Sequence, residues 1–421
     1  MENSSGPALN QSTNGPAAVP PAGASGASLA NQDRLYAMME AEGFNLLIAT
    51  TPENVYYTSG FLSLAHWVID SQTFVVIPRR GLGAPVIIFP MMDIDVFAEA
   101  DSWIKDFRCY QTFYIQEGEG VPGGIELRVR ELLQRTTGAG DVVESLLEVV
   151  GSLGLGRGRV AIEGKHLPWD LGEKIRAALP EAELVEARPY LRRVRMIKTP
   201  LEAGFLQASN HAIEEGLRAA MNLIRPGVTE VELDRAMNTR VAALGAVPAF
   251  AVVTGGTRSS LVHANPSDYA LQRGDIVRFD CGCRYRGYYS DTARTVVVGE
   301  AAPKTRRCYE ALRRGHARAL ELVRPGTPVA EIFNAAVEEV RKAGIPHYRR
   351  LHTGHAIGVQ LYDEPVITPG SEVVLEEGMV LNIEVPYYEL GFGGMNVEDT
   401  LVVTAGGYRM FSTLDRELLV L

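Results

Sequence analysis

Short apolar runs alternate with amphipathic stretches through the first half of the chain. The apolar runs predict strands at 45–50, 73–78, 84–90 and 159–163. Before the last of these, Asp141 is placed to cap a helix whose apolar residues recur at helical spacing. Because strand and helix signals interleave, residues from about 33 to 185 are typical of an α/β domain.

The pattern changes at Thr199, which is placed to cap a long amphipathic helix. One phrase then recurs, as LIRPGVTEVEL over 223–233 and as LVRPGTPVAEIF over 322–333. In each copy a helical pattern stops at Arg-Pro-Gly, and a threonine precedes the next helical pattern. Two matching phrases about 99 residues apart predict an internally duplicated domain.

Pairs of apolar strands follow these phrases. Residues 275–282 and 290–299 predict one antiparallel hairpin, and residues 379–388 and 395–404 predict a second. Helices combined with antiparallel hairpins make residues from about 200 to 421 an α+β domain.

Composition limits the class of protein. The chain has 421 residues, 46% of them hydrophobic and 22% charged, which is typical of a globular protein of two or three domains. The net charge of −10 argues against nucleic acid as a partner. The start of the chain lacks the basic and apolar regions of a secretory leader, and no apolar run is long enough to span a bilayer. We therefore expect a soluble, cytoplasmic protein with no membrane partner.

Two further patterns indicate structural features and not functional sites. GLGRG at 154–158 precedes a strand instead of following one, so it predicts a turn and not a nucleotide site. The chain has four cysteines and no CxxC pair, which indicates reduced thiols. Strand alternation places Cys281 and Cys283 on the face away from Asp280, where they would serve as packing residues.

Each predicted hairpin contains two acids within apolar strands. These acids are Asp280, Asp291, Glu384 and Glu398. A buried carboxylate is costly unless it is paired or coordinates a metal ion. One such acid would more simply face solvent, but four acids in two matched hairpins favour a shared site. His355, among glycines and small residues, adds one imidazole.

This set of side chains predicts a dinuclear metal centre. Four carboxylates and one neutral imidazole carry a charge of −4, which two divalent cations would neutralise. Oxygen-rich ligands with one nitrogen suit Mn²⁺, Co²⁺, Fe²⁺ or Zn²⁺. Two such ions about 3.5 Å apart can hold a bridging hydroxide and polarise a carbonyl, which is hydrolytic chemistry.

The motifs around these residues resemble those of the pita-bread metallopeptidases. They are FDCG…YYSDTART, TGHAIG, NIEVPYY and NVEDTLVVT. Upstream, residues 39–61 resemble the creatinase-type N-terminal domain of the proline-specific branch, so the resemblance extends over about 33–421. It implies a creatinase-like α/β domain at 31–190 and a catalytic pita-bread domain of duplicated helix–hairpin units at 191–421. Residues 1–30, rich in small and polar residues and without Lys or Arg, predict a disordered tail.

The resemblance also implies roles for individual residues. It assigns Asp280 to one ion, His355 and Glu384 to the other, and Asp291 and Glu398 to a bridging position. Glu384 is also expected to accept a proton from the bridging water and to pass it to the leaving nitrogen. His263 matches the upstream histidine that hydrogen-bonds the substrate or the transition state.

The chain departs from the family pattern at three expected substrate-binding positions. Tyr362 replaces the histidine seven residues after the metal histidine, and Asn396 replaces an arginine two residues before the last glutamate. A further histidine of the pattern, four residues before the metal histidine, is Leu351 here, and His352 follows it. These departures predict a site with fewer cations and weaker binding of a dipeptide's free carboxylate.

The leading hypothesis is an Xaa-Pro dipeptidase- or aminopeptidase-like hydrolase that cleaves a peptide or amide C–N bond, with manganese among its candidate ions. One alternative is a creatinase- or ectoine-hydrolase-like enzyme acting on a small non-peptide amide. Another is a DMSP-lyase-like metalloenzyme on the same scaffold. A non-catalytic binding module is disfavoured, because such relatives typically lack the five ligands. Relatives with this N-terminal domain commonly dimerise, which implies a homodimer.

Overall fold

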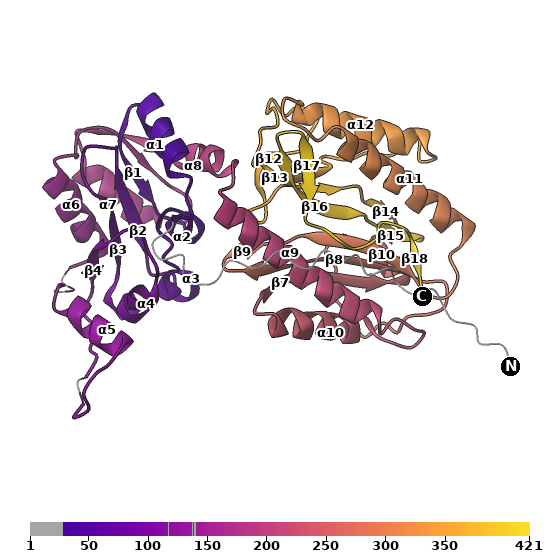
Figure 1. The fold of residues 1–421 in the computed structure, drawn as a ribbon, viewed down its shortest axis with the longest axis horizontal. Helices are drawn as coiled ribbons and strands as arrows, with labels where there is room; N and C mark the ends of the chain where they lie inside the picture. The colour runs from indigo at the N-terminus through magenta and orange to yellow at the C-terminus, as the bar shows by residue number, and fades with distance from the viewer. Residues whose placement is uncertain (1–27, 117, 137, 139) are drawn as a thin grey trace.

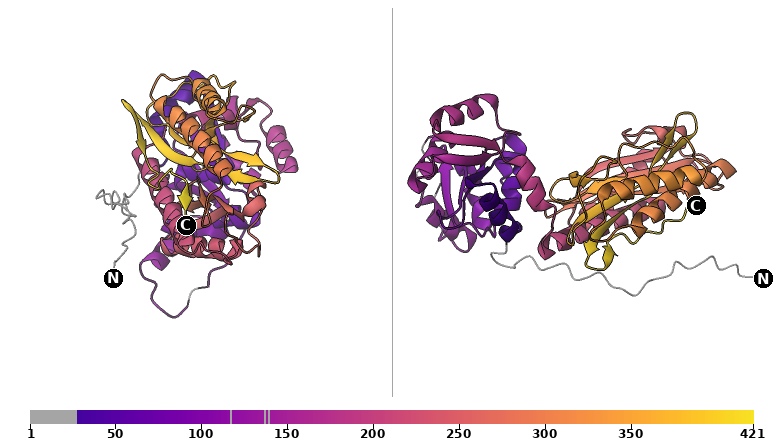
Figure 2. Two further views of the ribbon diagram at one scale, coloured as in Figure 1. Left: turned by 90° about the vertical axis from the view of Figure 1, so that its right-hand side faces the viewer. Right: turned by 90° about the horizontal axis from the view of Figure 1, so that it is seen from above.

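The computed structural model of the chain describes residues 28–116, 118–136, 138 and 140–421. Two lobes lie side by side, joined where α8 leads into α9 (Figures 1 and 2). Most of the expected tail lies outside the described residues. Its last residues correct the expectation, because Leu29 and Ala30 are buried against the core of the first lobe and therefore belong to the folded chain.

The first lobe is an α/β domain, as the alternating pattern predicts. Its elements are α1 (Gln32–Ala41), β1 (Phe44–Ala49), α2 (Pro52–Ser59), α3 (Leu64–Ile69), β2 (Phe74–Pro78), β3 (Val86–Pro90), the 3₁₀ turn η1 (Met91–Asp93), α4 (Ile94–Glu99), β4 (Asp106–Tyr110), α5 (Ile125–Leu133), α6 (Val142–Leu153), β5 (Gly158–Ile162), α7 (Trp169–Ala178), β6 (Ala182–Glu186) and α8 (Arg188–Arg195). The strands form one mixed sheet in the order β4-β3-β2-β1-β5-β6.

Both faces of this sheet are covered, which explains why its strands are almost continuously apolar. Leu47 of β1 faces a core shared with α1, α2 and α4, whereas its neighbour Leu46 faces a second core shared with α6 and α7. Asp141 caps α6 in a capping box with Glu144, as expected for a helix at this place. Gly154 ends α6 in the left-handed conformation, so the glycine-rich segment is a turn.

The second lobe is built from two similar halves. Its elements are α9 (Pro200–Met221), α10 (Glu230–Ala243), β7 (Val247–Gly255), the 3₁₀ turn η2 (Gly256–Ser260), β8 (Ile276–Tyr285), β9 (Tyr288–Tyr289), β10 (Thr292–Val297), α11 (Pro303–Glu321), α12 (Val329–Lys342), β11 (Gly354–Ala356), β12 (Asp363–Val366), β13 (Val380–Glu384), β14 (Tyr387–Glu389), β15 (Gly393–Met395), β16 (Glu398–Thr404), β17 (Gly407–Met410) and β18 (Leu419–Val420). One sheet runs β18-β10-β8-β7 and the other β12-β11-β13-β16-β17. Helices α9 and α10 pack on the first sheet, and α11 and α12 pack on the second.

Matching backbone hydrogen bonds support the predicted duplication. The amide of Gly227 donates to the carbonyl of Leu271 at 2.7 Å, and the amide of Gly326 donates to the carbonyl of Leu375 at 2.9 Å. Both glycines belong to the repeated Arg-Pro-Gly phrase and adopt positive φ. The phrase therefore marks the same turn in each half, bonded to the segment that precedes β8 in one half and β13 in the other.

One local expectation needs correction, and the two copies of the phrase differ in one detail. Helix α9 ends at Met221, before the Arg-Pro-Gly phrase, because the amides of Leu223 and Ile224 already fold back onto carbonyls of the last turn. In the second copy, Thr327 does not cap α12, since its hydroxyl donates to the carbonyl of Leu322. The N-cap of α12 is Pro328.

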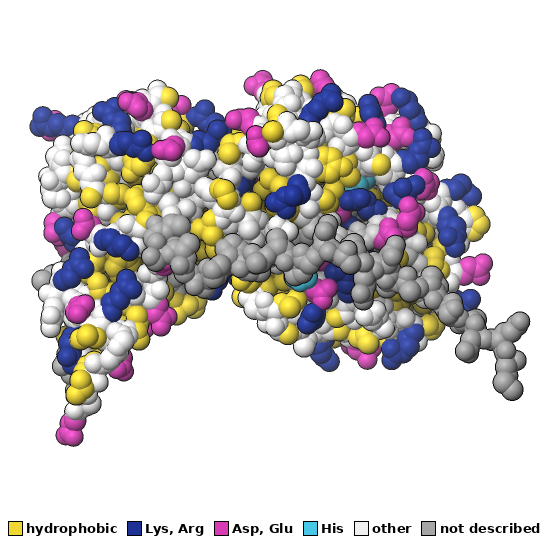
Figure 3. Space-filling model, in the orientation of Figure 1, with side chains coloured by type: hydrophobic (Ala, Val, Ile, Leu, Met, Phe, Trp, Pro, Cys, Tyr) yellow, Lys and Arg dark blue, Asp and Glu magenta, His cyan; other side chains and the backbone are white. Residues whose placement is uncertain are grey.

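Helix α8 and the start of α9 join the lobes, and the proposed domain boundary at 190/191 falls within α8. Arg195 at the end of α8 is buried and donates to Asp363 of the second lobe at 2.6 Å and to Asn54 of the first. On the face shown in Figure 3, basic and acidic side chains are intermixed over both lobes. No helix in the described part of the chain combines the length and apolarity needed to cross a membrane.

Candidate metal centre

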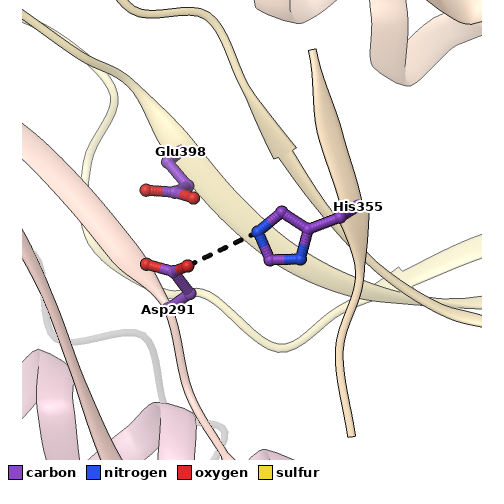
Figure 4. Close-up of side chains that lie close together, drawn as sticks. All are labelled: Asp291, His355 and Glu398. Atoms are coloured by element: carbon purple, nitrogen blue, oxygen red, sulfur yellow. Dashed lines mark ion pairs between the residues drawn. The ribbon is translucent and has the colours of Figure 1, made fainter. Parts of the chain in front are cut away.

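Three of the predicted ligands converge where the two halves of the second lobe meet. Asp291 directly precedes β10, His355 lies in β11, and Glu398 begins β16 (Figure 4). One ligand atom from each side chain lies within 4.8 Å of the others, and all three residues are buried. Across the described ranges, this is the one group of three such side chains close enough to share an ion.

Neighbouring groups fix how these side chains point. The Nδ1 atom of His355 lies 3.0 Å from the carbonyl of Ala356. Because a carbonyl can only accept, Nδ1 donates, which leaves Nε2, 3.5 Å from Asp291 Oδ2, as the ring nitrogen that can bind an ion. Asn382 donates to Glu398 Oε1 at 2.5 Å, so the other carboxylate oxygen of Glu398 is left for the site.

The charges and unpaired atoms of this cluster suit divalent cations. Asp291 Oδ1, His355 Nε2 and Glu398 Oε2 are buried and have no hydrogen-bond partner among the residues described. Burial, together with the neighbouring carboxylates, raises the pKa of Glu398 well above its usual range, and burial also raises the pKa of Asp291. A cluster in which carboxylates favour protons is short of positive charge, which metal ions can supply.

The two outer carboxylates lie in the hairpin strands and face cationic side chains. Asp280 of β8 pairs with Arg278 at 2.9 Å, while burial and the charge of Asp291 raise the pKa of Asp280 to about 7. Glu384, the last residue of β13, lies directly opposite Glu398 in the sheet. Burial alone would raise the pKa of Glu384, but His352 at 3.1 Å and Arg350 at 3.9 Å outweigh it and hold the pKa below its ordinary value.

The other predicted site residues have varied surroundings. Tyr362 stacks on the His355 ring, with centroids 3.8 Å apart. His352 is placed against Glu384, and His263 lies on an exposed loop after η2. Asn396 is fully buried, and within the described residues its side-chain amide has no hydrogen-bond partner. Cys281 and Cys283 pack in the core beneath β8, as strand alternation predicts.

Sequence reasoning missed two arginines, Arg278 and Arg350, that lie beside the outer carboxylates. Arg278 is two residues before Asp280 in the same strand, so alternation alone places both side chains on one face. Arg350 lies in the loop before β11, and only the path of that loop brings it close to Glu384. Both guanidinium groups lie near the ring of Tyr388, at 5.1 and 5.7 Å from its centroid.

The fold and this cluster define a two-domain metallopeptidase, and the comparisons with known proteins agree. Residues 205–405 match the metallopeptidase family M24, and residues 32–197 match the creatinase/prolidase N-terminal domain. The chain belongs to metallopeptidase family M24 and is a peptidase-type hydrolase. The members of this family are metal-dependent enzymes, and the second lobe, with its two similar halves, has their pita-bread fold.

The chain is similar to several named relatives. It is 32% identical to an Xaa-Pro dipeptidase of Pyrococcus furiosus over 262 residues, which cover 62% of this chain and 75% of that protein. It is 27% identical to the uncharacterized peptidase YqhT of Bacillus subtilis over 322 residues, which cover 76% and 87% of the two chains. The crystal structure of dipeptidase PepE from Mycobacterium ulcerans matches 92% of this chain and 97% of that one, with a TM-score of 0.75 and 28% identity.

Proposed function

We propose that the protein is a dinuclear metal-dependent peptidase that hydrolyses Xaa-Pro dipeptides. The observation that carries this proposal is the buried group of Asp291, His355 and Glu398, whose unpaired atoms face one another between two hairpins. Asp280 and Glu384, one from each hairpin, add the two further carboxylates that a second ion needs. The Xaa-Pro dipeptidase name of the Pyrococcus furiosus relative supports this choice of substrate.

Five side chains would hold the ions. Asp280 would bind one ion and His355 with Glu384 the other, while Asp291 and Glu398 would bridge them. The donors are oxygens with a single nitrogen, which fits Mn²⁺, Co²⁺, Fe²⁺ or Zn²⁺, and we propose Mn²⁺. When bound, such ions polarise a carbonyl and lower the pKa of water.

Protein groups would then position the substrate and move the proton. Glu384 would accept a proton from the attacking water and deliver it to the leaving nitrogen. Its low pKa, set by His352 and Arg350, keeps it ionised and able to accept. His263 would donate a hydrogen bond to the substrate, and Tyr362 would shield the ring of His355 on which it stacks.

A basic cavity supports a substrate with a free carboxylate. The cavity has a volume of about 590 Å³ and is lined by Arg341, Arg349, Arg350 and His352, with no acidic side chain in its wall. Arg350 and His352 also contact Glu384, so the cavity adjoins the candidate centre. A dipeptide whose scissile bond lies at Glu384 would place its carboxylate near these arginines.

We further propose a homodimer in the cytoplasm. Leu64, Val68 and Ile69 of α3 are exposed apolar side chains, which a second copy of the chain could cover. All four cysteines are free thiols, which fits a reducing compartment. Sedimentation of the purified chain at micromolar concentration is expected to give twice the monomer mass.

The test of the function combines metal content with a substrate panel. After reconstitution with Mn²⁺, elemental analysis is expected to approach two ions per chain, and an Xaa-Pro dipeptide is expected to be hydrolysed. The panel includes a longer Xaa-Pro peptide and small N-methyl amides. Full activity of the metal-free protein would exclude the dinuclear mechanism, and activity confined to the non-peptide amides would exclude the dipeptidase.

A further inference from the structure

Arg278 is a fully buried arginine, and each of its three side-chain nitrogens donates to a defined acceptor. Its Nε donates to the carbonyl of Ser259 at 3.0 Å, and its Nη2 donates to the carbonyls of Leu261 and Val262 at 2.8 and 3.0 Å. Its Nη1 donates to Asp280 Oδ2 at 2.9 Å. One guanidinium therefore joins strand β8 to the segment that leads into His263.

The arrangement is more than charge compensation for a buried acid. A lysine would neutralise Asp280 as a point charge, whereas the planar fork of arginine reaches several acceptors at fixed angles. Three carbonyls hold the guanidinium, so its position does not depend on Asp280. The remaining donor therefore fixes where the Asp280 carboxylate lies.

The far end of the same loop is also anchored. Glu230 is buried and accepts from the Ser267 amide at 2.9 Å and from Arg258, and Arg258 donates to the carbonyl of Asn265 at 3.1 Å. His263 thus lies between two fixed points, with Arg278 as the fixed point nearer the centre.

Arg278 also adjoins the position of the arginine that the chain lacks. Thr295 of β10 pairs with Arg278 across the sheet, and its hydroxyl bonds the backbone amide and carbonyl of Asn396. Strand β8 is therefore linked through Thr295 to the backbone at position 396.

We propose that Arg278 is a positioning residue that holds Asp280 and the loop before His263 in one arrangement. The inference rests on the proposed function, in which Asp280 binds one of two ions. Among the arginines in the described part of the catalytic lobe, Arg278 is the one that pairs with Asp280; Arg294, also buried, pairs with Asp399.

The experiment measures ion binding by the full-length chain, not hydrolysis. Metal-free wild type, R278M and R278K are titrated with Mn²⁺ by calorimetry, and their Co²⁺ forms are compared by visible absorption. R278M is expected to bind one ion as the wild type does and the other about ten- to a hundredfold more weakly, with an altered Co²⁺ spectrum. R278K is expected to recover part of that affinity because the charge beside Asp280 remains.

Amide hydrogen exchange of the metal-free proteins tests the link to the loop. Both variants are expected to exchange faster over 259–263, because neither side chain can bond three carbonyls there. R195M is the matched control: it removes another buried guanidinium, but Lys198 still pairs with Asp363 at 3.4 Å. It is expected to lower the melting temperature and to leave both ion affinities unchanged.

Three results would overturn the inference. The first is R278M with both wild-type ion affinities and an unchanged Co²⁺ spectrum. The second is amide exchange over 259–263 that is as slow in the variants as in the wild type. If R278M does not fold, the exchange of R278K alone tests the proposal. A wild type that does not bind two ions would overturn the proposed function together with this inference, whereas the first two results leave the function intact.

Discussion

The two halves of the catalytic lobe share a backbone plan but hold their outer carboxylates differently. In the first half, Asp280 pairs with Arg278, which is fully buried and tied to three carbonyls. In the second half, Glu384 faces His352 and Arg350, whose side chains are 22% and 18% exposed and line the basic cavity. The duplication thus provides equivalent positions, but one carboxylate is paired with a single buried arginine and the other with two partly exposed cations.

This difference matches the two roles proposed for the carboxylates. A ligand that only binds an ion benefits from a rigid partner, because preorganisation keeps its geometry. A carboxylate that also exchanges protons has to meet substrate and water, and both cations that contact Glu384 line the basic cavity. The two carboxylates assigned to the bridging position, Asp291 and Glu398, have more similar surroundings: both are buried, and each has one oxygen without a hydrogen-bond partner.

The largest loss of activity is expected at Asp291 and Glu398, which occupy equivalent positions in the two halves. D291A removes an inner carboxylate from the first half and E398A removes one from the second, and each would disturb both ions. Metal ions supply several kcal/mol of transition-state stabilisation, so kcat/KM is expected to fall about 10³-fold or more in both variants. Steady-state hydrolysis of an Xaa-Pro dipeptide measures this, with the exposed acid variant E310A as control. A loss in only one of the two variants would show that the halves do not share a bridging role.

Much of this scaffold follows from local pattern. The apolar runs predict β1, β2, β3 and β5 within a residue or two but miss β4 and β6, and the acids within apolar strands identify both hairpins, because burial of a carboxylate is rarely neutral. The repeated phrase predicts the duplication, since Gly227 and Gly326 make the same turn. These features depend on residues close together in the chain.

The features that the sequence did not predict depend on contacts between distant segments. Arg350 reaches Glu384 only through the path of its loop, and Tyr388 joins the two arginines from a separate hairpin. Considered alone, Asn396 stands where the family pattern has an arginine, and so it predicts the loss of a positive charge. Arg278 and Arg350 place positive charges beside the outer carboxylates from other positions, which a comparison of motifs position by position does not detect.

A smaller effect, on KM, is expected from removing one of the two cations beside Glu384. R350M removes the arginine that lies between Glu384 and the cavity. A charge-assisted hydrogen bond to a carboxylate contributes about 1.5–3 kcal/mol, so KM for an Xaa-Pro dipeptide is expected to rise about ten- to a hundredfold. The same peptide with a C-terminal amide is expected to change little, and R314M, an exposed arginine variant on α11, serves as control. An equal loss on both substrates would mean that Arg350 acts through Glu384 instead.

The smallest expected effect concerns stability and distinguishes the long helices that begin the two halves. Helix α9 begins with a capping box of Thr199 and Glu202, whereas Ala302 before α11 makes no side-chain cap. Glu202 is fully buried, and burial raises its pKa from 4.5 to about 7 despite the charge of Lys198. The folded chain therefore keeps a proton that the unfolded chain releases between pH 4.5 and 7, so folding stability falls as the pH rises through that window.

E202Q is expected to remove this pH dependence. Glutamine is compatible with a capping box, so the helix start is preserved. At pH 8 the variant is expected to be more stable than the wild type by up to about 3 kcal/mol, the equivalent of the pKa shift, and at pH 4 the two are expected to be equal. Thermal unfolding at both pH values measures the difference. E232Q is the matched control, since Glu232 occupies the same place in the capping box of α10 but is exposed, and it is expected to give no gain at pH 8. A gain by E202Q of the same size at both pH values would show that packing, and not the buried charge, sets the difference between the helices.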